Sequence, residues 1–188
     1  ADEDALGAGH LARHGEGGLV VDVDPVGAVQ AARVEPESLT SFQGFAVSPD
    51  GSTLAGTGQL TGLLLIFDLT DRDGPRLRDQ VAVGRQPWHP IYHPTDNVVY
   101  FGVKMDNKVV AVDTDSGEIL WDRATKAALP EQEYSGFMAL HGYASATPAT
   151  DGKAVYAFFG KSGVYAYSLA GEELRGALAL FRLELGEF

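Results

Sequence analysis

Short hydrophobic runs separated by polar turn residues recur along most of this 188-residue chain. Three extended runs end in Asp followed by Gly or Asn, at positions 50–51, 96–97 and 151–152. These pairs favour tight hairpin turns, because Gly and Asn tolerate the positive φ that such turns need. The three Asp residues are 46 and 55 residues apart, so the pattern predicts a repeat of about 46 residues built from β-hairpins.

Three more apolar runs follow each of these turns and predict three further strands. The second runs cover 52–58, 98–104 and 154–160, the third cover 62–68, 108–113 and 163–168, and the fourth cover 76–83, 119–123 and 172–177. The third runs end at Asp68, Asp113 and Ser168, and an earlier run ends at Asp22, which gives gaps of 46, 45 and 55 residues. Two sets of landmarks therefore share one period, and the longer last interval predicts a loop insertion at 127–136.

Helical periodicity is nearly absent, since only 10–14 and 124–133 have room for a turn or two. Four short strands per repeat make one blade of a β-propeller. The sequence therefore predicts an all-β fold, a β-propeller of four-stranded antiparallel blades, with about 3.5 to 4 blades in this chain. We expect a Gly-rich leader at 1–17 and a single full or partial propeller domain at 18–188. The domain divides into a half blade at 18–36 and blades at 41–84, 85–126 and 137–180.

The blade count leaves closure of the ring open, because propellers typically have about four to eight blades. Residues 178–188 could supply one closing strand from the same chain. Alternatively, two copies could form a homodimer that completes a seven-bladed ring, or the sequence is a fragment of a longer chain. These alternatives predict different masses in solution.

Composition excludes several classes of partner. Lys and Arg total 14 against 26 Asp and Glu, and the net charge of −12 disfavours nucleic acid. The longest apolar run, 63–67, is too short to span a membrane, and the N-terminal residues lack a signal-peptide pattern. The absence of cysteine excludes disulfides and thiolate metal sites but is compatible with a periplasmic, secreted or cytoplasmic location.

The run from Ala111 to Trp121 resembles the tryptophan-docking motif of quinoprotein-type propellers, with Asp113 and Gly117 at the other matching places. Residues 141–167 are similar to pyrroloquinoline-quinone-like repeat proteins. The earlier segments VSPDG and VVAVDT are more similar to YVTN and lactonase-like propellers. The resemblance implies the propeller fold. It does not imply the quinone, because the cysteine pair that clamps that cofactor in the family is absent and the docking Trp occurs once, with Ala31, Arg78 and Arg175 at the equivalent places.

Three histidines are candidate ligands for a divalent metal. His89 and His93 are separated by four residues, which on a strand places both side chains on one face. His141 precedes the first strand of the next blade and is the natural third ligand at the same channel mouth. The alternative is that these histidines cap strand ends or line the central channel.

Trp88, Tyr143 and Arg85 are the candidate ligand-binding residues. Trp88, on the inner strand of a blade, is the aromatic residue that we most expect to line a pocket, and packing in the core is the alternative. The aligned carboxylates of Asp22, Asp68 and Asp113 are expected to accept hydrogen bonds from turn amides and not to converge on calcium. No nucleophile is indicated, since no Gly-x-Ser-x-Gly motif or phosphate loop occurs.

These features favour a non-catalytic β-propeller scaffold that binds a protein or small ligand at the channel mouth or top loops. The alternative is a quinoprotein-like or lactonase-like enzyme with a metal or quinone on the propeller axis. A third hypothesis is a partial or recombined propeller without a task of its own.

Overall fold

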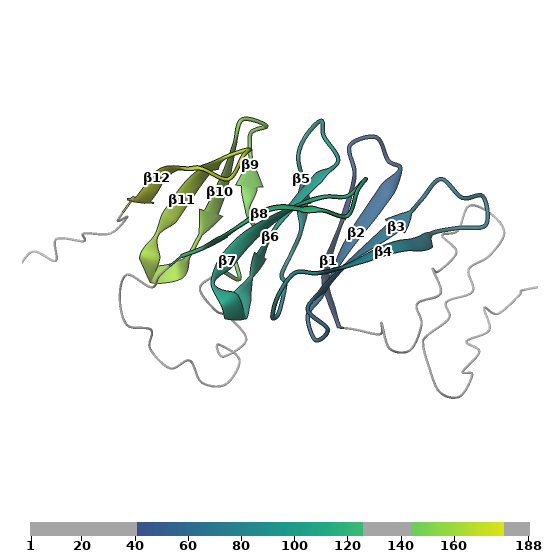
Figure 1. Ribbon diagram of the computed structural model, residues 1–188, viewed down its shortest axis with the longest axis horizontal. Helices are drawn as coiled ribbons and strands as arrows, with labels where there is room; N and C mark the ends of the chain where they lie inside the picture. The colour runs from purple at the N-terminus through teal and green to yellow at the C-terminus, as the bar shows by residue number, and fades with distance from the viewer. Residues whose placement is uncertain (1–40, 126–143, 179–188) are drawn as a thin grey trace, which may run out of the picture.

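The computed structural model describes residues 41–125 and 144–178, which form three four-stranded antiparallel sheets (Figure 1). We call these sheets the first, second and third blades. The first blade contains β1 (Phe42–Val47), β2 (Thr53–Gly58), β3 (Leu63–Asp68) and β4 (Arg76–Ala82), and the second contains β5 (Ile91–Tyr92), β6 (Val98–Val103), β7 (Lys108–Asp113) and β8 (Ile119–Ala124). The third contains β9 (Ala149–Thr150), β10 (Ala154–Phe158), β11 (Val164–Ser168) and β12 (Glu173–Leu178), and short 3-10 turns cover Lys104–Asp106 and Gly160–Ser162.

The predicted all-β class and the four-stranded repeat are confirmed, and most strand boundaries agree within one or two residues. β7 covers the predicted run 108–113 in full. The first strands β5 and β9 are shorter than expected, with two residues each. Pro90 and Pro94 flank β5, and Pro148 precedes β9; since proline lacks the N–H that a β-ladder needs, these residues limit both strands. The half blade at 18–36 and the insertion at 127–136 lie outside the described residues.

Aspartates fix the turns as the sequence predicts. Asp68 Oδ1 accepts the Thr70 amide at 2.7 Å, and Asp113 Oδ1 accepts the Asp115 amide at 2.8 Å. Hydrogen bonding of this kind to the ionised form, by the Thr70 hydroxyl and amide, lowers the pKa of Asp68. The predicted structural role of Asp68 and Asp113 is therefore confirmed, whereas Asp22 lies outside the described residues.

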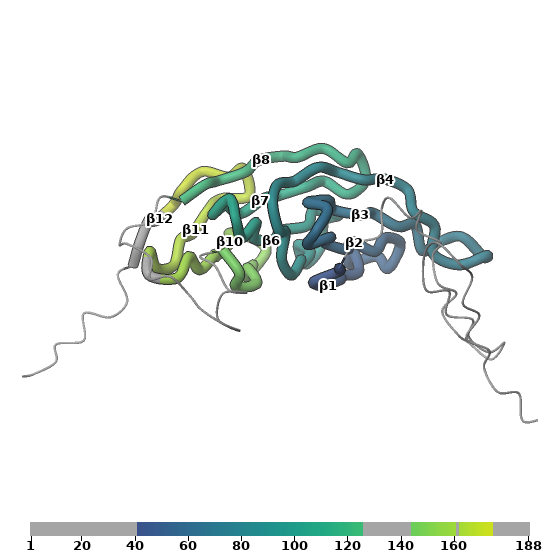
Figure 2. Tube along the Cα trace, turned by 90° about the horizontal axis from the view of Figure 1, so that it is seen from below, coloured from purple at the N-terminus to yellow at the C-terminus, as the bar shows by residue number. Residues whose placement is uncertain are grey.

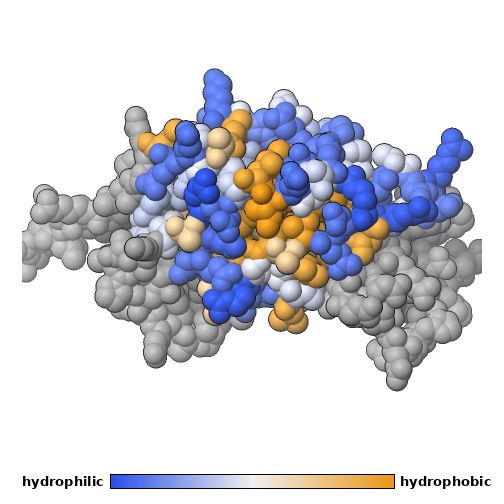
Figure 3. Space-filling model, in the orientation of Figure 1, coloured by the Kyte–Doolittle hydropathy of each residue, from blue (hydrophilic) through white to orange (hydrophobic). Residues whose placement is uncertain are grey.

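The blades lie face to face along a curved arc, with β4 and β8 on its convex side (Figure 2). The second blade contributes side chains to two hydrophobic cores, one on each face of its sheet, because successive side chains of a strand point to opposite faces. Val110 and Val112 of β7 pack against the first blade, whereas Val109 and Ala111 pack against the third. Full burial of each Val contributes about 1.5–3 kcal/mol, so these two clusters hold the arc together. Apolar surface is visible at the centre of one face, with hydrophilic residues around it (Figure 3).

Trp121 joins the second blade to the third. Its indole Nε1 donates to the carbonyl oxygen of Leu169 at 2.8 Å, and the side chain is only 5% exposed. The ring lies against Gly171, where an added Cβ would come within 2.6 Å of Trp121 Cγ. Arg123, two residues further along β8, donates from Nε to the Gly171 carbonyl at 2.5 Å. The tryptophan-docking motif therefore makes an inter-blade contact, and it requires glycine at position 171.

The same contact occurs one blade earlier with a different side chain. Arg78 stands four residues after Gly74, as Trp121 stands four residues after Gly117, and its Nη2 donates to the carbonyl oxygen of Thr114. Thr114 follows the end of β7, as Leu169 follows the end of β11. Arg78 thus bonds to the backbone carbonyl that is equivalent, one blade earlier, to the carbonyl bonded by Trp121. The inter-blade contact repeats although the residue type does not.

We expect Trp121→Ala to lower the free energy of unfolding by about 3 kcal/mol or more, because it leaves a cavity and removes the bond to Leu169. Trp121→Arg should lose clearly less, since Arg78 makes the equivalent contact. Urea unfolding followed by far-UV circular dichroism measures both changes. Leu120→Ala, at a half-exposed neighbour, is the control and should change stability by no more than about 0.5 kcal/mol. Equal losses for the Arg and Ala variants would show that the two inter-blade contacts are not equivalent.

Candidate functional site

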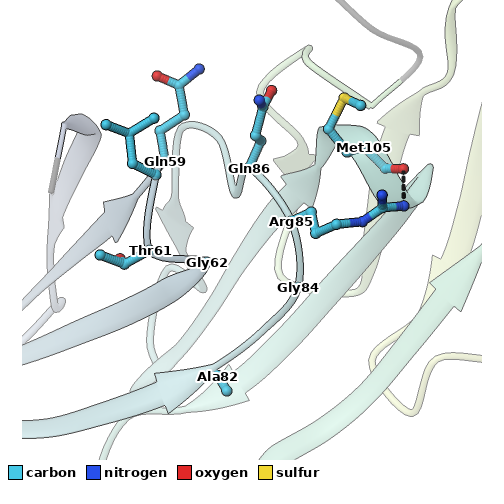
Figure 4. A pocket seen from close by; sticks show the side chains of 9 residues that line it. Gln59, Thr61, Gly62, Ala82, Gly84, Arg85, Gln86 and Met105 are labelled. Atoms are coloured by element: carbon cyan, nitrogen blue, oxygen red, sulfur yellow. Dashed lines mark hydrogen bonds between the residues drawn. The ribbon is translucent and has the colours of Figure 1, made fainter.

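A pocket lies where loops of the first and second blades meet, and its volume is about 480 Å³ (Figure 4). This volume falls within the range of about 300–1,000 Å³ that is usual for ligand sites. Three segments form it: the β2–β3 loop, the segment that follows β4, and the turn after β6. The lining residues are Gln59, Leu60, Thr61, Gly62, Ala82, Gly84, Arg85, Gln86 and Met105.

Two glycines allow the pocket loops to approach each other closely. Gly62 has φ of 73°, and a Cβ there would lie 2.7 Å from the Gly84 carbonyl oxygen. Gly84 has φ of 118°, and a Cβ there would collide with the Asp106 carboxylate. Val83 donates its amide to the Gly62 carbonyl at 3.0 Å, which ties the two loops together. A side chain at either glycine position would therefore force the loops of the pocket apart.

Arg85 and Asp106 clamp the segment after β4 to the turn after β6. Arg85 Nε and Oδ1 of Asp106 are 2.8 Å apart, and the Arg85 amide donates to Oδ2 at 2.8 Å. Arg85 Nη2 also donates to the Met105 carbonyl at 3.1 Å. Partial burial would raise the pKa of Asp106, but the hydrogen bonds from Arg85 outweigh it and hold that pKa below its ordinary value. The segment after β4 and the turn after β6 are thus held together by the guanidinium of Arg85 and the carboxylate of Asp106.

Gln86 is under strain on the pocket wall. Its φ is 58°, in the left-handed region that residues other than glycine seldom adopt. The amide of Lys104 donates to its backbone carbonyl at 3.0 Å and helps to hold this conformation. Its side-chain Oε1 is enclosed and has no hydrogen-bond partner among the residues that the structure describes. An enclosed acceptor without a donor costs about 1–3 kcal/mol, which adds to the cost of the strained backbone.

Apolar side chains stand on two sides of the pocket. Leu60 is 76% exposed and Met105 is 48% exposed. Gln59, Gln86 and Met105 rise from three neighbouring loops in the same direction (Figure 4). The pocket therefore combines two amide side chains with apolar contact area.

The predicted ligand-binding residues have different environments. Arg85 lines the pocket. Trp88 is buried, and the Lys104 ammonium lies 5.7 Å from its ring centre. Burial lowers the pKa of Lys104. Tyr143 lies outside the described residues. Ligand binding by Arg85, Trp88 or Tyr143 stays a prediction.

The predicted metal ligands do not share a strand, because β5 contains only the two residues Ile91–Tyr92 and the histidines flank it. Nδ1 of His89 is 3.4 Å from the Thr147 hydroxyl, before β9. Nε2 of His93 is 3.2 Å from the Gly152 carbonyl, after β9, and its Nδ1 accepts the Asp96 amide at 3.1 Å.

Neither histidine has a metal-like cluster around it in the described ranges 41–125 and 144–178, where no three His, Asp or Glu side chains come together. His141, the third predicted ligand, lies outside these ranges. The contacts of His93 fit the alternative of a capped strand end, and metal binding stays a prediction.

Sequence reasoning missed Gln59, Gln86, Leu60 and Met105. Gln59 and Leu60 come directly after Gly58, and Gln86 comes shortly after Gly84. A glycine at the end of an apolar run was thus the available signal for these three loop residues. That signal places a residue in a loop, but it does not show which loops of neighbouring blades face each other.

Comparisons with known proteins identify the fold. No protein family matches the sequence, and no curated protein matches it either. The structure is similar to BamB from Moraxella catarrhalis, with a TM-score of 0.57, 16% identity, and coverage of 79% of this chain and 39% of that chain. It is also similar to hydrazine synthase from Kuenenia stuttgartiensis, with a TM-score of 0.55, 20% identity, and coverage of 80% and 38%.

This chain forms part of a β-propeller. Both solved structures are propellers of the pyrroloquinoline-quinone-like kind, so the predicted resemblance holds at the level of the fold. The chain spans about two fifths of the length of either protein. Within the part of the chain that is described, no helix is long and apolar enough to cross a membrane.

We expect the Arg85–Asp106 pair to make the protein less stable in acid. The lowered pKa of Asp106 means that its contribution is fully present above the ordinary value of 3.8 and is lost as pH falls through the folded-state pKa. Asp106→Asn should therefore flatten the fall of the urea midpoint between about pH 5 and pH 2. Arg85→Ala should flatten it similarly, and the double variant should add little, because the two groups act as a pair. Additive effects of the two substitutions would contradict this coupling.

Proposed function

We propose that this chain is part of a propeller that serves as a non-catalytic recognition scaffold and binds a protein or small ligand in the pocket between its first two blades. The observation that carries the proposal is Gln86, which lines the pocket with its backbone held in the left-handed region. Strained residues cluster at active sites and ligand-binding segments. The Arg85–Asp106 clamp fixes the loops beforehand, which lowers the entropic cost of binding.

The pocket lining supports binding over catalysis at this place. It contains amides, one hydroxyl, one guanidinium and apolar groups, and its nine residues include no His, Asp or Glu. General acid–base chemistry needs a titratable group within hydrogen-bond reach of the substrate. The lining offers hydrogen bonds and apolar contact instead.

The test is an NMR titration of ¹⁵N-labelled protein with a library of small neutral fragments. We expect shift changes gathered at Gln59–Gly62 and Gly84–Gln86, and their loss in Arg85→Ala, because that variant releases the clamp. Arg72→Ala is the matched control, since Arg72 is exposed and does not line the pocket. Native mass spectrometry on protein purified without chelator tests the enzyme alternative. A stoichiometric metal or quinone adduct, or fragments that bind only elsewhere, would overturn the scaffold.

We also propose a second copy of the chain as the partner for the two outer faces of the arc. Phe45 of β1 and Phe158 of β10 are 52% and 50% exposed. The residues next to them face the second blade. Ala46, next to Phe45, pairs with Ala55 of one inner core, and Ala157, next to Phe158, belongs to the other. Phe45 and Phe158 thus lie on the two sides of the arc that point away from the second blade, and a head-to-tail pair of arcs would cover them.

We expect this 188-residue chain to sediment near 40 kDa, twice its mass of 20.0 kDa. Its melting temperature should rise with concentration, because association stabilises both copies. Phe158→Glu should give a monomer by analytical ultracentrifugation. Leu120→Glu, at a similarly exposed residue of β8, should leave the dimer intact. A monomer whose melting temperature is the same at every concentration would refute the second copy.

A further inference from the structure

We infer that Arg175 docks the third blade onto a second copy of this chain by donating to the backbone carbonyl of that copy's Leu69. This inference rests on the second copy proposed above and adds the hydrogen bond that orients it. Three features carry it: a strand register that the second and third blades share, an exposed face around that register, and an acceptor at the opposite end of the arc.

The third blade repeats the strand pairing that positions Trp121 in the second. In each blade a row of paired residues runs from a tyrosine through an alanine to the docking position. The rows are Tyr100, Ala111 and Trp121 in the second blade, and Tyr156, Ala166 and Arg175 in the third. In both blades the pairing of the last two strands shifts directly beside the alanine. Since cross-strand partners share one face of a sheet, Arg175 occupies the position from which Trp121 bonds to the next blade.

Arginine already makes this contact in the first blade. Arg78 and Arg175 each stand four residues after the glycine of the turn before their strand. Arg78 Nη2 donates to the carbonyl oxygen of Thr114 in the second blade. A guanidinium carries several N–H donors and a permanent charge, which strengthens its hydrogen bonds. Arginine at position 175 is therefore a suitable docking residue for a further blade.

The face of the third blade that carries this row is uncovered. Tyr156 is 39% exposed and Phe158 is 50% exposed, whereas Tyr100, in the equivalent row of the second blade, is 2% exposed. Tyr100 packs in the core between the second and third blades, 5.9 Å from the Trp121 ring. Phe158 stands where β6 has Gly102, so the partner must leave room for an aromatic ring at this place. The third blade thus presents one half of an inter-blade interface.

The opposite end of the arc offers the matching acceptor. Thr114 and Leu169, whose carbonyls accept the two inter-blade bonds, are the first residues after β7 and β11. Leu69 is the first residue after β3, and no residue in the described ranges donates a hydrogen bond to its carbonyl. An arc with a docking residue at one end and an acceptor at the other is complementary to a second copy of itself.

The first test compares substitutions at position 175 by sedimentation equilibrium. We expect Arg175→Leu to weaken dimerisation by about tenfold or more, because it removes the charged donor. Arg175→Trp should keep the dimer, since Trp121 makes the equivalent bond. Lys153→Ala removes one positive charge from an exposed turn of the same blade and should match the wild type. Equal weakening by Leu and Trp would overturn the docking bond, and far-UV circular dichroism confirms that each variant keeps the fold.

The second test uses the absence of cysteine from the chain. Leu174→Cys and Thr70→Cys flank the proposed bond, so a mixture of these two variants should give a bismaleimide cross-link of twice the chain mass. Each variant alone should give no such product. Leu120→Cys and Ala170→Cys, placed together in one chain, flank the Trp121 bond in the same way and calibrate the cross-linker.

The outcomes separate this inference from the proposed second copy. A chain that is monomeric at every concentration would refute both. A dimer that is lost in Phe158→Glu but unchanged in Arg175→Leu, with no cross-link between positions 174 and 70, would leave the second copy standing. Arg175 would then not be its docking residue.

Discussion

The structure depends on one repeated constraint: each blade must be held at a fixed angle to the next. A single antiparallel sheet has two faces, and apolar burial alone lets sheets slide, because the hydrophobic effect has no direction. A directional bond removes this freedom. Arg78 and Trp121 each cross to the backbone carbonyl that follows the third strand of the next blade. Since the acceptor is backbone, the contact survives changes of sequence at the acceptor position.

The candidate site inherits its geometry from this constraint. Loops of two separate blades can form a defined pocket only if the blades themselves do not move. Between the first and second blades, the Arg85–Asp106 pair and the Val83–Gly62 hydrogen bond add a second level of fixation. The left-handed conformation of Gln86 costs energy and needs such surroundings to persist.

The sequence predicted those parts of the fold that depend on local patterns. Strand periodicity and Asp-Gly turns located β7 in full and the other long strands to within one or two residues, because both signals act over a few residues. Prolines shortened β5 and β9 against the pattern. The equivalence of Arg78 and Trp121 was not predictable from residue type, since it depends on a shared acceptor position in the neighbouring blade. Of the pocket-lining residues, Arg85 was among the predicted candidates, but Gln59 and Gln86 come to the same pocket only through the packing of two blades.

The next inter-blade space, between the second and third blades, differs from the pocket in how closely the blades approach each other. Between the second and third blades, a Cβ at Gly102 would collide with the Ala144 carbonyl, so the two backbones are already in contact there. The surrounding space is lined by Ala157, Phe158 and Phe159 among others and has no room for a water-sized molecule. One repeat architecture therefore yields a closed junction where small residues let backbones touch. It yields an open one where the loop is anchored by a charged pair, so the position of the site is set by a few loop residues and not by the blade repeat.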